Sequence, residues 1–218
     1  MKVYTSQLKK VLSPQESKLF KRLNTAQKIQ DYLDSLPINF EAEGDTIYSP
    51  RQVMREKKAH CLEGALFAAA VLAFHGHKPL LLDLQTLPYD DDHVVTLFEQ
   101  HGHWGAISKT NHSILRWRDP VYQTPRELAM SFFHEYFMND GVKTLRAFSK
   151  PFDLTQYPPE TWVIAEGGLE HLAEDLDDSP HEPSVPPALS RRKLRKTSGV
   201  ECKILDFVEW KSEKKRLY

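Results

Sequence analysis

The segment ALFAAAVLAF, residues 65–74, constrains the fold more than any other part of the sequence. A helix formed by these residues is apolar on every side, so it has no face that suits water. A helix that crosses a bilayer needs about 20 such residues, and this run is too short for that role. We therefore expect a helix buried in the core, ending near His75 and Gly76.

The segments around this helix predict both helices and strands. Apolar spacing, capping residues and runs of β-forming residues identify them, and EQHG is the turn of a hairpin. The patterns predict helices at residues 16–34, 49–57 and 124–137, strands at 78–86 and 114–122, and a hairpin at 93–108. Helices and strands in this order indicate an α+β fold.

The character of the chain changes near residue 150. Residues 15–150 contain most of the predicted elements and are expected to form the core domain. Residues 151–218 are expected to be a C-terminal extension, which has a proline-rich linker at 177–187 and an alternating, strand-like segment at 200–211.

Composition excludes several classes of protein. The net charge of the 218 residues is −1, so the chain is not a basic nucleic-acid binder. The two cysteines are too few for a disulfide framework, which favours a reducing compartment. The N-terminus lacks an apolar run of signal-peptide length. We expect a cytoplasmic protein that is not bound to a membrane.

Three residues occur in an order that suggests nucleophilic catalysis. Cys61 begins the buried helix, where the helix dipole and a nearby imidazole would favour the reactive thiolate. His93 begins a strand and is the candidate base. Asp119 ends a later strand and is the candidate group that orients the imidazole. Packing of the sheet against the helix would bring the three together.

The same residues carry a resemblance to the transglutaminase-like superfamily, which has the papain-like fold. It rests on the segments GDTIYSPRQVMREKKAHCLEGALFAAAVLAFHGHKPLLL, DHVVTLFEQHGHWGAISK and RDPVY, and it covers about residues 24–137. The resemblance implies a Cys-bearing helix packed on an antiparallel sheet, with Cys61, His93 and Asp119 as a triad. Members of that superfamily include crosslinking enzymes, peptidases, amide-cleaving enzymes and inactive relatives.

One position departs from the family pattern. The acidic residue usually comes four residues after the tryptophan of the strand that follows the histidine strand, and here that position is Ser108. Asp119 lies beyond an insertion, and Asn111 within the insertion is a second candidate for orienting His93. We favour Asp119, because a carboxylate also stabilises imidazolium. The oxyanion donors would include the backbone N–H of Cys61, and nothing selects Gln27 or Gln30 as another.

Other polar residues near Cys61 have simpler interpretations. Glu63 is a carboxylate favoured by the helix dipole. His60 is not expected to act as the base, because adjacent residues on a helix do not face each other. The other histidines lie in expected turns without a metal-binding motif, so we expect no metal or organic cofactor.

These observations support thiol-dependent acyl transfer or amide hydrolysis. The substrate would be a protein, a peptide or a small amide, and the sequence does not indicate an oligomeric state. Two alternatives remain open. The first is a cysteine peptidase of the same fold. The second is a non-catalytic binding or scaffold domain that keeps only the cleft.

Overall fold

The computed structural model describes residues 1–42, 44–190 and 194–211. Its centre is a seven-stranded sheet in which every pairing is antiparallel. The strands follow the order β4-β3-β2-β1-β5-β7, and β6 also pairs with β1. Their bounds are β1 Leu80–Gln85, β2 His93–Gln100, β3 His103–Ile107, β4 Arg118–Tyr122, β5 Ala147–Ser149, β6 Phe152–Asp153 and β7 His181–Pro183.

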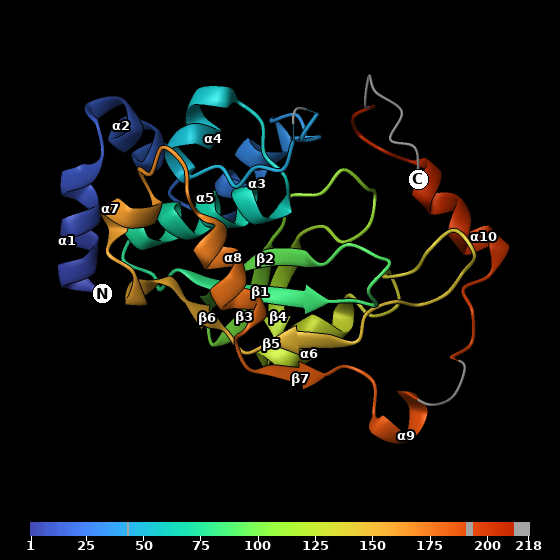
Figure 1. Ribbon diagram of the computed structural model, residues 1–218. Coiled ribbons are helices and arrows are strands. Elements are labelled where there is room, and N and C mark those ends of the chain that lie inside the picture. The colour runs from blue at the N-terminus through green and yellow to red at the C-terminus, as the bar shows by residue number, and fades with distance from the viewer. Residues whose placement is uncertain (43, 191–193, 212–218) are drawn as a thin grey trace.

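Helices cover the sheet, and Figure 1 shows α5 lying along β1 and β2. The first five are α1 Lys2–Val11, α2 Pro14–Arg22, α3 Ala26–Asp34, α4 Pro50–Glu56 and α5 Cys61–Phe74. The later ones are α6 Pro125–Ser131, α7 Pro159–Trp162, α8 Glu170–Asp177, α9 Pro187–Ser190 and α10 Gly199–Cys202, with 3₁₀ turns at Leu154–Gln156 and Lys203–Asp206. The expected α+β class is therefore confirmed.

The buried helix predicted from ALFAAAVLAF is α5. Every residue from Leu62 to Phe74 is buried, and His75 ends the helix as expected. Alternate residues of β2 belong to different apolar clusters. Val94 packs with α5, and Val95 packs on the opposite face with Leu128 of α6. The sheet is thus covered on both faces, which explains why β2 is buried from His93 to Phe98.

Several predicted boundaries differ from the structure. The hairpin at 93–108 is present as β2 and β3, but the helix expected at 16–34 is two helices, α2 and α3. The prediction of a strand at 200–211 is wrong, because α10 and a 3₁₀ turn occupy residues 199–206. Its alternating pattern does not follow burial, since Phe207 is 68% exposed.

Much of the expected C-terminal extension is built into the core. The strands β6 and β7 join the sheet, and Trp162 is fully buried in the same cluster as α5. Residues 194–211 lie apart from that core beside the loop after β3, as Figure 1 shows at the C-terminal end. Residues 191–193 and 212–218 of the extension lie outside the described residues. None of the described helices is long and apolar enough to cross a bilayer.

Candidate active site

Cys61 is the first residue of α5, where the helix leaves its initial N–H groups unpaired. The helix starts there because His60 has extended backbone angles (φ −92°, ψ −172°) and its carbonyl accepts a hydrogen bond from the N–H of Gly64. Cys61 is partly exposed, whereas the rest of α5 is buried. This placement at the positive end of the helix dipole favours the thiolate.

His93 lies at the start of β2, close to Ser108, which directly follows β3. The ring Nε2 of His93 lies 2.8 Å from Ser108 Oγ, and that Oγ lies 2.6 Å from the carbonyl oxygen of Leu115. A carbonyl only accepts, so the single hydroxyl proton of Ser108 is donated to Leu115. Nε2 of His93 therefore donates to Ser108. In the neutral ring, Nδ1 is then the unprotonated nitrogen.

The thiol of Cys61 lies within hydrogen-bonding reach of the rings of His93 and His60. Burial alone would raise the pKa of the Cys61 thiol. Hydrogen bonds from His60 and His93, together with the charges of both rings, outweigh burial and lower the pKa to about 5. The thiolate therefore predominates at neutral pH, and it is the nucleophilic form of cysteine.

His60 is the residue that sequence reasoning missed. The rule for adjacent residues applies when both are helical, and His60 precedes the helix in extended conformation. Its Nε2 lies 2.9 Å from the carbonyl oxygen of Thr46 and 3.4 Å from Oε1 of Glu63. Burial alone would lower the pKa of His60. The hydrogen bond and charge of Cys61, the charge of Glu63 and the Thr46 carbonyl raise it to about 9.

Glu63 is fully buried one turn into α5. Its two carboxylate oxygens accept hydrogen bonds from the amide of Asn39, the hydroxyl of Thr46 and the backbone N–H groups of Tyr48 and His60, at 2.9–3.1 Å. Every one of these groups donates to the carboxylate, a pattern that suits an ionised side chain. Glu63 thus provides a fixed acceptor beside His60 and ties the preceding loop to α5.

The structure places Asp119 and Asn111 in other interactions. The carboxylate of Asp119 is exposed on the edge strand β4 and accepts a hydrogen bond from the indole N–H of Trp117 at 2.9 Å. The side chain of Asn111 bonds to the backbone N–H and carbonyl of Trp210. The ring of His93 thus contacts the hydroxyl of Ser108, whereas Asp119 bonds to Trp117. The residue at the departure from the family pattern is therefore the one that contacts His93.

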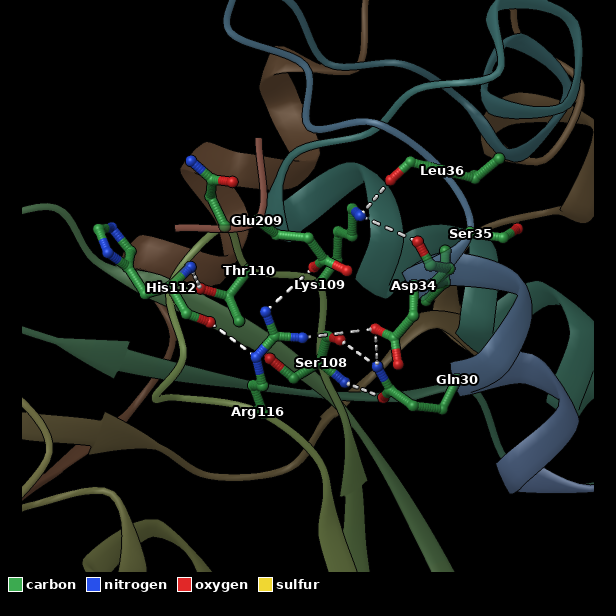
Figure 2. Close-up of polar contacts among 12 residues, drawn as sticks. Gln30, Asp34, Ser35, Leu36, Ser108, Lys109, Thr110, His112, Arg116 and Glu209 are labelled. Atoms are coloured by element: carbon green, nitrogen blue, oxygen red, sulfur yellow. Dashed lines mark hydrogen bonds and ion pairs between the residues drawn. The ribbon is translucent and has the colours of Figure 1, made fainter. Parts of the chain in front are cut away.

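Ser108 is held in place by Gln30 of α3, as Figure 2 shows. The Gln30 side chain donates to the carbonyl of Ser108 at 2.7 Å and accepts from its N–H at 2.9 Å. The neighbouring Lys109 is buried, and its Nζ donates to the carbonyls of Leu33 and Leu36 at the end of α3. Because the Gln30 amide is already paired with Ser108, it is not available as an oxyanion donor.

A cavity of about 230 Å³ lies beside these residues. Its lining is mainly apolar and includes Leu115, Tyr136, Phe137 and Leu205. Leu115 is also the residue whose carbonyl binds Ser108. The pKa of the Tyr136 hydroxyl is raised well above its usual value by burial and by the charge of Cys61, so this side chain lies near the thiol. The cavity adjoins the site, and Cys61, His93 and Ser108 are not among its lining residues.

Among residues 1–42, 44–190 and 194–211, no group of three or more His, Cys, Asp or Glu side chains is arranged to hold a metal ion. Comparison with known proteins does not assign the site to a family. No protein-family model matches the chain, and no curated protein sequence matches it significantly.

Proposed function

We propose that this protein is a thiol-dependent enzyme that transfers an acyl group or hydrolyses an amide, with a papain-like, transglutaminase-like core. The observation that carries the proposal is the thiol of Cys61, a partly exposed residue, which lies within reach of two imidazole rings and has a pKa lowered to about 5. Lowered thiol pKa values of this size are typical of nucleophilic cysteines rather than of cysteines buried for packing.

The geometry supports a two-step reaction. The thiolate of Cys61 attacks the carbonyl carbon of the amide, and the backbone N–H of Cys61 faces the developing oxyanion. The C–N bond then breaks, the amine leaves with a proton from the His93 imidazolium, and a thioester forms on Cys61. Water or a second amine attacks the thioester and gives a proton to His93, which releases the acid or new amide and restores the thiolate.

The alternatives differ in what they require of this site. A cysteine peptidase uses the same residues and differs only in accepting a peptide bond. A scaffold domain has no need of a thiol within reach of two imidazoles. The site therefore favours a catalyst over a scaffold.

The thiol can be tested without knowing the substrate. In a Cys202→Ser background only Cys61 reacts with iodoacetamide, and its rate is followed from pH 4 to pH 10. We expect the rate to rise with a midpoint near pH 5 in the native protein. After unfolding in urea the midpoint should move to about 8.5. A native midpoint near the unfolded value would contradict an activated cysteine.

Turnover is tested with p-nitrophenyl acetate, which acylates reactive thiols. We expect an acetyl group on Cys61 by mass spectrometry, followed by its release in water. His93→Ala should slow the release by about 10²-fold or more, because general base catalysis contributes that much. A stable acyl adduct whose release does not depend on His93 would overturn the catalytic proposal.

A further inference from the structure

The two imidazoles that face Cys61 have unlike surroundings. His93 is 5% exposed, and the partner of its Nε2 is a neutral hydroxyl, that of Ser108. His60 has its Nε2 directed at the Thr46 carbonyl, with carboxylate oxygens of Glu63 at 3.4 Å and Glu41 at 3.8 Å. The Nε2 of His60 therefore has two carboxylates within 4 Å, whereas the Nε2 of His93 contacts a neutral hydroxyl.

We propose that His60 is a fixed cation that stabilises the Cys61 thiolate, with the buried Glu63 as its counter-charge, and that His93 alone carries the proton during catalysis. This inference rests on the proposed function for the role of His93. The role of His60 can be measured on the thiol itself. His60 is thus a positioning residue, since it acts through the sulfur.

Charge balance explains why two histidines are useful here. In the resting site the buried Glu63 carboxylate is the counter-charge of the His60 ring, and the sulfur lies within reach of both imidazoles. Formation of the thioester removes the charge on sulfur. His93 then gives its proton to the leaving amine, whereas His60 keeps the Glu63 carboxylate 3.4 Å from its Nε2.

The other titratable groups near the site do not replace this pair. Tyr136 approaches the thiol from the segment after α6, and its raised pKa keeps the hydroxyl neutral through the working range. His112 lies near His93, and burial together with the charge of His93 lowers its pKa, so it adds no positive charge at neutral pH. Glu41 lies on the loop before α4, on the same side of His60 as Glu63.

The first experiment compares His60→Gln, His93→Gln and the exposed control His77→Gln, all in the Cys202→Ser background. At pH 7 we expect the rate of Cys61 alkylation by iodoacetamide to fall at least about tenfold in His60→Gln, because less thiolate is present. It should also fall in His93→Gln, which removes the second hydrogen bond and charge beside the sulfur, and stay unchanged in His77→Gln. An unchanged alkylation rate in His60→Gln would overturn the inference.

The second experiment needs no change at His60, which guards against misfolding of that variant. Alkylation of native Cys61 with iodoacetamide removes the charge on sulfur as acylation would. We expect imidazole ¹⁵N shifts at pH 7 to show His60 still as imidazolium and His93 converted to the neutral ring with its proton on Nε2. A neutral His60 in the alkylated protein would contradict the role of Glu63.

The two proposals fail in different ways. If His60 stays charged but no ester or amide is turned over, the inference about His60 holds and the enzyme proposal fails. If p-nitrophenyl acetate is turned over but His60 is neutral, the enzyme proposal holds and the inference about His60 fails.

Discussion

Ser108 shows how one side chain sets the chemistry of another. Its hydroxyl has a single proton, and the carbonyl of Leu115 takes it, so only the lone pairs face His93. That arrangement fixes the tautomer of His93 without placing a charge next to the ring. A carboxylate in the same position would hold the imidazolium more strongly and would make its proton harder to release.

The role of Ser108 can be separated from that of Asp119 by substitution. We expect Ser108→Ala to slow the release of the acetyl group from Cys61 by about tenfold or more, because the His93 ring loses its orienting acceptor. Asp119→Ala should leave the release rate unchanged, since its carboxylate contacts Trp117. The measurement is the rate of p-nitrophenyl acetate turnover in both variants. A larger effect for Asp119→Ala would restore Asp119 as the orienting residue.

Among elements, the contact between the start of α5 and the end of β3 decides whether the site assembles. Gly64 lies at this contact, where a Cβ atom would come within 2.5 Å of Cβ of Lys109. A glycine costs helix stability, and here its lack of a side chain allows the close approach. Because Lys109 adjoins Ser108, the same contact sets the distance between the His93–Ser108 pair and Cys61.

We therefore expect Gly64→Ala to destabilise the protein by about 1–3 kcal/mol, the usual cost of overpacking a core. A new contact at Lys109 should also push β3 away from α5 and raise the midpoint of Cys61 alkylation. The matched control is Gly167→Ala, where an added Cβ has no atom within 4 Å, and its effect should stay within about 0.5 kcal/mol. Urea unfolding of both variants tests this, and equal stabilities would contradict it.

At the scale of the whole molecule, the described C-terminal residues 194–211 are attached differently from the rest of the chain. They contact the loop after β3 through polar groups, such as the Asn111 amide with Trp210 and the Arg116–Glu209 ion pair at 3.0 Å. Their apolar side chains are largely outside the core, with Val200 79% exposed and Phe207 68% exposed. Exposed ion pairs and single hydrogen bonds each contribute about 1 kcal/mol or less.

Deletion of the chain from residue 199 onward should therefore cost little stability. We expect a loss of about 1–2 kcal/mol, which lowers the thermal midpoint by roughly 2–8 °C in a protein of this size. Trp162→Ala, which removes a fully buried side chain of the core, should cost about 3–5 kcal/mol. Calorimetry distinguishes the two. A deletion as damaging as Trp162→Ala would show that this segment belongs to the core.

Much of the arrangement could be predicted from local patterns. The apolar run after Cys61 predicts the buried α5, and the β-forming runs around EQHG predict the β2–β3 hairpin, because both depend on residues close in sequence. The strand expected at 200–211 shows the limit of such patterns. Alternation predicts a strand only where one face is buried, and this segment has no sheet beside it.

Capping and periodicity are local properties, so the amino-acid pattern alone predicts that Cys61 begins a buried helix and that His93 begins a strand. The partners of their side chains follow from the packing of the fold. Ser108 reaches His93 because β3 pairs with β2 and because Gln30, 78 residues away in sequence, holds its backbone. His60 reaches the thiol because its backbone is extended and Glu63 is buried beside it. These contacts depend on packing between distant segments, which a local pattern does not contain.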